Sequence, residues 1–252
     1  MAVVIKLSDT PGMPIRHVTH RNLVQDFQIS QLTLQFNYPP AYLLWDRAGE
    51  LTRKVSVLWP GWKLEKAEAG SVQALAKNAR VQMGLDMSYV IVTGPKGFGA
   101  AEQIAKTIQL WTSILELETI DKIGTRAIFQ KKYADRESAH KAYLAMNLVN
   151  WPPRRVFDCA VDSPLNGGSA HLQFEDDQAL TIVRVSPQQV AIEIPAQEEF
   201  PEIEGKKVVD RVIVDVDRQT KKPIDAARFS APDWLKGYQH LLNRDLPEIV
   251  GK

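Results

Sequence analysis

Apolar and polar residues alternate with a period of two through much of residues 28–133, which predicts strands with one buried face. The expected strands are residues 28–36, 42–46, 51–59, 80–85, 87–93 and 120–133. Residues 42–46 and 51–59 are expected to pair as a hairpin around the turn at residues 47–50.

The period changes to 3.6 at residues 100–118, which predicts a helix packed on the sheet. Its apolar side carries Ile104, Ile108, Trp111 and Leu115. A second helix is expected at residues 136–149, with Asp135 in the capping position before it.

The chain beyond residue 153 reads as closely spaced strands followed by one helix. The expected strands are residues 154–161, 169–175, 179–186, 189–194 and 207–217. The helix is predicted to begin after Ser230 and to end at Pro247. Its apolar side is expected to carry Trp234, Tyr238, Leu241 and Leu242.

The segment Trp151-Pro152-Pro153 is the clearest boundary, because two prolines interrupt both a helix and a central strand. We expect an N-terminal extension with the first strand at residues 1–40, a first half at 41–150 and a second half at 151–252. Each half runs strands first and a covering helix afterwards. This order predicts an α+β fold of two antiparallel-sheet-plus-helix halves packed together, rather than a doubly wound α/β fold.

Composition narrows the classes of function. The net charge of the 252 residues is +1, which gives no electrostatic case for a strong nucleic-acid or membrane binder. Residues 1–150 carry 18 Lys and Arg against 13 Asp and Glu, whereas residues 151–252 carry 13 against 17. No apolar run is long enough to span a bilayer, and the start of the chain lacks the features of a signal peptide. A single cysteine, Cys159, forms no internal disulfide, so we expect a cytoplasmic protein.

Two short patterns carry a resemblance to a known family. They are Ile123-Gly124-Thr125-Arg126 after a long helix, and Val212-Ile213-Val214-Asp215-Val216-Asp217 before a terminal helix. In these patterns and in element order, residues 45–246 resemble a widespread but sporadically distributed bacterial family of two-part α+β proteins. That family has no assigned activity, so the resemblance implies the fold and carries over no functional residue.

A glycine-rich loop joins the strand at residues 87–93 to the following helix. Gly94 and Gly99 have the spacing of a phosphate-binding loop, but Ala100 and Ala101 stand where that motif needs Lys and Ser or Thr. The sequence therefore predicts no nucleotide cofactor. A helix N-terminus can still hold an anion, and the members of such a site would be Gly94, Lys96, Gly97 and Gly99. The alternative is an ordinary strand-to-helix connection.

Asp215 and Asp217 lie two residues apart on a predicted strand and therefore share one face of the sheet. Two carboxylates on one face suit a divalent cation, and hence a metal-dependent hydrolase or nuclease. A solvated face of an amphipathic strand accounts for the same pattern. Arg126 lies among apolar residues on another strand and needs a carboxylate. We expect it to form an ion pair with Asp215 or Asp217 that joins the two halves.

Trp59 and Trp62 lie in a basic stretch with Arg53, Lys54 and Lys63. Aromatic side chains interleaved with basic ones suit single-stranded nucleic acid, and the alternative is that the tryptophans pack in the core and over an edge.

The sequence contains no pattern that would bring an acid, a base, a nucleophile or metal ligands together in one site. We therefore predict a non-enzymatic interaction or regulatory subunit of a bacterial assembly, with a protein partner and no cofactor. The metal-dependent enzyme and the nucleic-acid binder stay open as alternatives.

Overall fold

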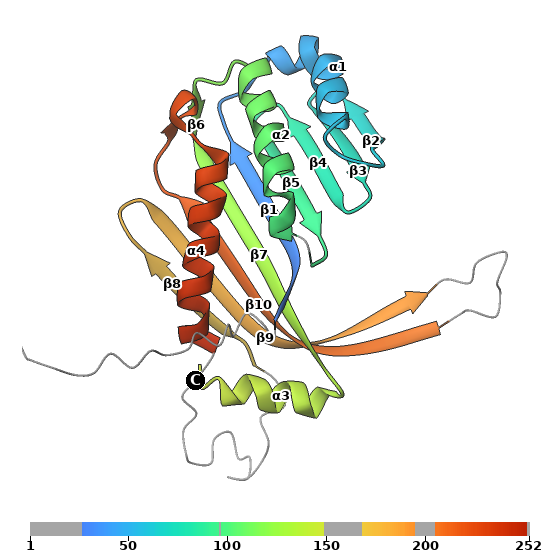
Figure 1. The fold of residues 1–252 in the computed structure, drawn as a ribbon, viewed down its shortest axis with the longest axis vertical. Coiled ribbons are helices and arrows are strands. Elements are labelled where there is room, and N and C mark those ends of the chain that lie inside the picture. The colour runs from blue at the N-terminus through green and yellow to red at the C-terminus, as the bar shows by residue number, and fades with distance from the viewer. Residues whose placement is uncertain (1–26, 96, 149–167, 195–204, 251–252) are drawn as a thin grey trace, which may run out of the picture.

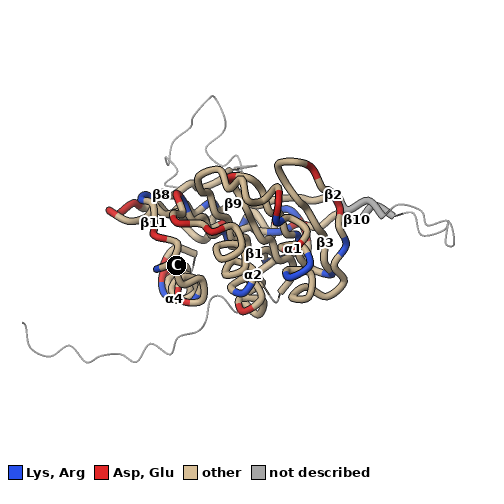
Figure 2. The backbone as a smooth tube through the Cα atoms, turned by 90° about the horizontal axis from the view of Figure 1, so that it is seen from above, with Lys and Arg blue, Asp and Glu red and all other residues tan. Residues whose placement is uncertain are grey.

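One antiparallel sheet of nine strands organises the described part of the chain, and helices cover one of its faces (Figures 1 and 2). The computed structural model describes residues 27–95, 97–148, 168–194 and 205–250. The expected α+β class is confirmed.

The elements are β1 (Gln28–Asn37), α1 (Leu43–Ser56), β2 (Lys63–Glu68), β3 (Ser71–Ala76), β4 (Ala79–Gly84), β5 (Met87–Thr93), the 3₁₀ turn η2 (Gly97–Ala100), α2 (Ala101–Ile114), β6 (Thr119–Ile120), β7 (Lys122–Tyr133), α3 (Arg136–Ala145), β8 (Ala170–Glu175), β9 (Ala179–Ile194), β10 (Gly205–Thr220), β11 (Ile224–Asp225), the 3₁₀ turn η3 (Ala226–Arg228) and α4 (Ala231–Val250). The order across the sheet is β2-β3-β4-β5-β1-β7-β10-β9-β8, and β6 pairs separately with β11. The division expected near residues 151–153 lies outside the described residues. Strands from both sides of it share this one sheet, which is joined where β7 pairs with β10.

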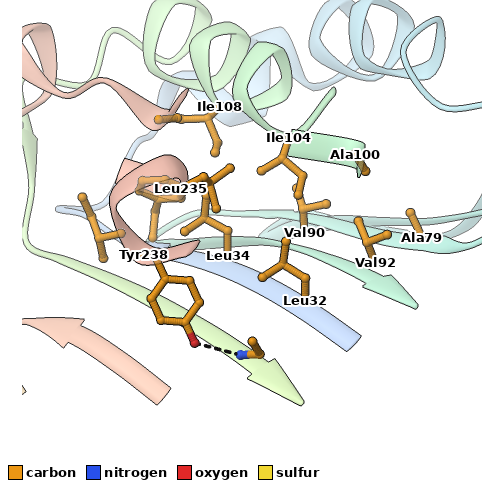
Figure 3. Close-up of a cluster of buried hydrophobic side chains, with 14 of the residues drawn as sticks. Leu32, Leu34, Ala79, Val90, Val92, Ala100, Ile104, Ile108, Leu235 and Tyr238 are labelled. Atoms are coloured by element: carbon orange, nitrogen blue, oxygen red, sulfur yellow. Dashed lines mark hydrogen bonds between the residues drawn. The ribbon is translucent and has the colours of Figure 1, made fainter. Parts of the chain in front are cut away.

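Alternation along the strands builds the core. On β1, the side chains of Leu32, Leu34 and Phe36 are buried, whereas the polar residues between them are half-buried on the opposite face. Helix α2 packs on the buried face, where Ile104 and Ile108 meet the strands (Figure 3). The predicted apolar side of this helix, Ile104, Ile108, Trp111 and Leu115, is buried as expected.

The predicted hairpin at residues 42–46 and 51–59 is wrong, because α1 occupies this stretch. Leu44, Leu51 and Val55 are its buried residues, at spacings of seven and four that place them on one helical side. Glu50 and Lys54 form an ion pair of 2.6 Å at the i,i+4 spacing. The period of 3.6 is therefore the one that the fold uses here.

Two predicted strand and helix ends differ in the second part of the chain. Residues 179–186 and 189–194 form one strand, β9, because Pro187 lies just beyond the end of β8, on an edge that no other described strand pairs and where a strand accommodates proline. Helix α4 continues past Pro247 to Val250, since Leu246 and Ile249 pack against the core. Helix α3 begins as expected, with the Asp135 carboxylate accepting the Ser138 N–H at 2.7 Å. The strand predicted at residues 154–161 lies outside the described residues.

None of the helices in the described residues is both long and apolar enough to cross a lipid bilayer.

Candidate functional site

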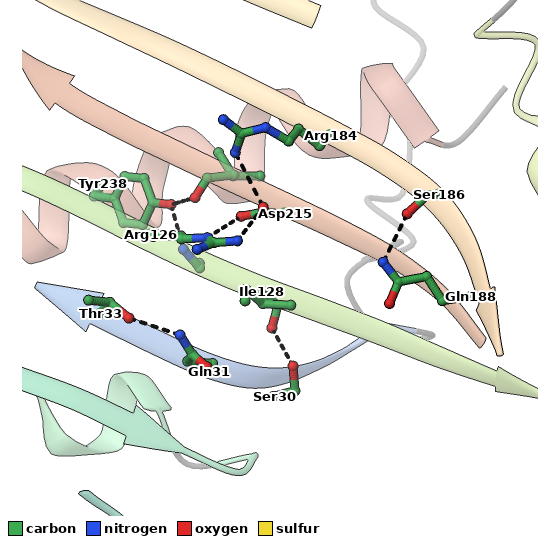
Figure 4. Close-up of polar contacts among 12 residues, drawn as sticks. Ser30, Gln31, Thr33, Arg126, Ile128, Arg184, Ser186, Gln188, Asp215 and Tyr238 are labelled. Carbon is green, nitrogen blue, oxygen red and sulfur yellow. Dashed lines mark hydrogen bonds and ion pairs between the residues drawn. The ribbon is translucent and has the colours of Figure 1, made fainter. Parts of the chain in front are cut away.

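The seam between β7 and β10 brings the charged residues singled out in the sequence together. The register places Arg126 opposite Asp217 and two positions from Asp215, on the same face, and Arg184 of β9 directly opposite Asp215. The Arg126 guanidinium donates to Asp215 twice, from Nε to Oδ1 and from Nη2 to Oδ2, both at 2.8 Å (Figure 4). Arg184 Nη1 donates to Asp215 Oδ2 at 3.3 Å. The expected ion pair between Arg126 and Asp215 is thus present.

The burial of the two partners differs from the expectation. The Asp215 side chain is 9% exposed, but that of Arg126 is 45% exposed, because it lies on the sheet face opposite α2 and α4. The hydrogen bond to Asp215 is the main cause that raises the pKa of Arg126. Arg126 is therefore a half-exposed partner of a buried carboxylate, not a buried arginine.

The two carboxylates of the metal hypothesis have different surroundings. Both oxygens of Asp215 accept hydrogen bonds from guanidinium groups, so they are occupied on the sides where a cation would bind. Burial is the main cause that raises the pKa of Asp217, with the nearby Arg184 guanidinium opposing it. No group of three His, Cys, Asp or Glu in the described residues is placed to hold a metal ion.

Tyr238 of α4 reaches the same seam from the covered face. Ala127 N–H donates to its hydroxyl at 3.1 Å, and the hydroxyl donates to the Val216 carbonyl at 2.8 Å. Because Ala127 and Val216 are directly opposite each other in the register, the hydroxyl is inserted into the β7–β10 ladder. Trp234 Nε1 donates to Thr125 Oγ1 at 2.6 Å, so α4 is bonded to β7 at two places.

Two glycines of the glycine-rich loop allow the backbone conformation and the close packing that this loop requires. Gly94 has a φ of +94° and donates its N–H to the Ser30 carbonyl at 2.8 Å. Gly97 is buried against β1, where an added Cβ would lie 3.0 Å from Ile29 Cδ1 and 3.2 Å from Leu32 Cβ. Lys96 lies outside the described residues, and the anion site therefore stays a prediction.

The tryptophan stretch is not a hairpin, and one of its rings is not accessible. Trp59 is 2% exposed and donates from Nε1 to Thr107 Oγ1 at 2.9 Å, so it belongs to the contact between the end of α1 and α2. Trp62 is half-buried against the core. Of the basic residues expected here, Lys54 pairs with Glu50, while Lys63 is exposed on the edge strand β2. The stacking of a base on Trp59 would require that ring to leave the core.

A protruding pair of strands was missed in the sequence. β9 and β10 pair over sixteen positions, but β8 reaches only to Val185 and β7 only to Asp210. Residues 190–194 of β9 and residues 205–209 of β10 therefore form a two-stranded ribbon that projects from the sheet (Figure 1). We call these residues the ribbon arm. The apolar alternation on both sides of Pro187 was its signal in the sequence, but proline was taken as a break.

Comparisons with known proteins identify no family. A scan against protein-family models finds no match, and a search of the curated proteins finds none either. Two solved structures of TP0453 are similar at 12% identity: crystal form I covers 86% of this chain and 98% of that chain, and crystal form III covers 84% and 97%. The TM-score is 0.17 in both cases, so neither likeness carries an inference about this chain.

Proposed function

We propose that this protein is a non-enzymatic interaction or regulatory subunit of a bacterial assembly, and that it binds its protein partner through the ribbon arm. The observation that carries the proposal is the arm itself, two paired strands whose outer edges extend beyond β7 and β8. The bacterial assembly rests on the family resemblance. The cytoplasm is its proposed compartment, since one cysteine forms no internal disulfide.

An isolated two-stranded ribbon is marginally stable in water, and its outer edges present unpaired N–H and C=O groups. A partner that adds a strand to such an edge pairs these backbone groups, and a partner that packs on the face of the ribbon stabilises it. The arm also offers apolar surface, because Val208 is 49% exposed. Val190 and Val209 are opposite each other in the register, on the other face of the arm.

Charge favours a protein over a nucleic acid as the partner. The stretch of sequence that connects the two strands of the arm contains Glu198, Glu199, Glu202 and Glu204 and no basic residue before Lys206. A phosphate backbone would be repelled by these carboxylates. The partner that fits is a protein surface with apolar side chains and basic residues around them.

Site-specific photo-crosslinking in the native host tests this proposal. A photoreactive amino acid in place of Val208 should give one discrete adduct. The same amino acid in place of Val57, which is 81% exposed and lies outside the arm, should give no adduct of that mass. The adduct is identified by mass spectrometry and its partner is purified. An adduct of twice the chain mass would identify a second copy as the partner.

A shortened arm completes the test with the purified partner. Replacing residues 190–209 by an Asn-Gly turn joins β9 and β10 at the end of β7 and leaves the nine-stranded sheet intact. We expect this variant to keep the cooperative unfolding of the parent and to lose at least about tenfold in affinity, a change of about 1.4 kcal/mol. A folded variant that binds the partner with unchanged affinity would refute the role of the arm.

A further inference from the structure

A cavity of about 400 Å³ lies between the C-terminal half of α4 and the strands β8, β9 and β10. Its walls are largely apolar, with Val183 and Val216 from the sheet and Leu241 and Leu242 from the helix. Ligand sites in proteins have volumes of this order and combine apolar walls with a few placed polar groups.

Arg218 supplies such a group in the lining of the cavity. On the covered face of β10 it is the next residue after the buried Val212, Val214 and Val216. Its side chain is only 22% exposed. A guanidinium that is largely removed from water needs an anion to balance its charge.

The acidic partner that the structure provides for Arg218 is distant. Within the described residues, Arg218 Nη1 donates to Thr181 Oγ1 at 2.8 Å, and Nη2 lies 3.9 Å from Asp176 Oδ2. The other oxygen of Asp176 accepts the N–H groups of Gln178 and Ala179, both at 2.7 Å. Since Asp176 is engaged in its own turn and its side chain is 61% exposed, it leaves the charge of Arg218 incompletely balanced.

The remaining charged groups that line the cavity are more exposed than Arg218. Arg244 and Asp245 pair with each other on the exposed side of α4, and Glu248 is exposed one turn further on. Arg218 is therefore the least exposed charged group in the lining of the cavity.

We propose that this cavity binds an amphipathic carboxylate, with the carboxylate group on Arg218 and the apolar body along Val183, Val216 and Leu242. A carboxylate accepts two parallel N–H bonds from a guanidinium, which matches the donors that Arg218 has left. The apolar body gains by leaving water for the walls of the cavity. This site is independent of the ribbon arm and of the proposed protein partner.

Calorimetric titration of the full chain with octanoate tests the site. The comparison ligands are octan-1-ol, which has the same apolar body without the charge, and acetate, which has the charge without the body. We expect saturable binding of octanoate, at least about tenfold weaker binding of octan-1-ol, and no binding of acetate. Equal affinities for octanoate and octan-1-ol, or no binding of octanoate, would overturn the proposal without the use of any variant.

Variants locate the site. Arg218→Gln should weaken octanoate at least about tenfold and leave octan-1-ol unchanged, and Arg218→Lys should retain part of the difference. Arg228→Gln is the matched control, because the Arg228 side chain is 85% exposed and outside the cavity. Octanoate affinity that is the same in Arg218→Gln, Arg228→Gln and the parent would place the carboxylate elsewhere and refute the proposal.

Discussion

Two carboxylates on one strand face have opposite surroundings at the β7–β10 seam. Asp215 is nearly buried and is balanced by Arg126 and Arg184. Asp217, two residues later, has a raised pKa, and its burial is the main cause. The ionised form of Asp217 therefore costs the fold free energy at neutral pH, whereas the ionised form of Asp215 accepts charge-assisted hydrogen bonds.

This difference predicts a pH-dependent effect of Asp217→Asn. An aspartate whose pKa is higher in the folded than in the unfolded state binds more protons when folded, so stability falls as pH rises through that interval. The amide removes this loss. We expect Asp217→Asn to be more stable than the parent in urea unfolding at neutral pH, with a difference that shrinks toward about pH 4, near the ordinary pKa of aspartate. Asp177→Asn, on an exposed turn, is the control. A variant less stable than the parent at neutral pH would contradict this account.

The sequence allows the partner of Arg126 to be predicted but not its exposure. An arginine flanked by apolar residues on a strand needs a carboxylate, and the paired acids of the second part were candidates by face and charge. Strand parity says which residues share a face, but not which face a helix will cover. Arg126 is half-exposed because α2 and α4 cover the other face.

At the scale of single elements, hydrophobic periodicity predicts the helices and strands in which one side is fully buried. Helix α2 and strand β5 follow their patterns, because each has a continuous row of buried side chains. Helix α1 was missed, since its buried residues Leu44, Leu51 and Val55 are widely spaced and exposed apolar residues such as Trp45 and Val57 obscure the period. Tertiary packing decides between the two periods in such a stretch.

Trp111→Ala should cost about 3–5 kcal/mol of unfolding free energy, the usual range for the loss of a core aromatic. Trp111 is 1% exposed, and its Nε1 has no hydrogen-bond partner among the described residues, so the loss is one of packing. Trp45→Ala is the matched control, because Trp45 is 59% exposed on α1 and should change stability by no more than about 0.5 kcal/mol. Equal effects of the two substitutions in denaturant unfolding would show that α2 does not anchor the core.

At the scale of the whole molecule, the strand order was beyond the sequence. Arg126 and Asp215 lie 89 residues apart in the chain, and nothing in either strand specifies that β7 should pair with β10 rather than end a sheet. A strand at the edge of one sheet and a strand inside a larger sheet show the same alternation of apolar and polar residues, so the pattern does not tell them apart. What joins the two parts is a combination of backbone pairing, the Arg126–Asp215 ion pair and the hydroxyl of Tyr238.

We therefore expect the whole nine-stranded sheet, and not only the strands after residue 153, to need helix α4 for stability. A chain truncated after Ser230 loses the Tyr238 bridge between Ala127 and Val216 and the Trp234 bond to Thr125, and uncovers apolar residues on both sides of the seam. We expect this truncation to be insoluble or to unfold without cooperativity, because an uncovered apolar sheet face aggregates. A truncation after Val250 should behave as the full chain, since α4 is complete there. Thermal unfolding of the soluble fractions measures both, and a truncation after Ser230 that stays soluble and unfolds cooperatively would show that β7 and β10 hold together without α4.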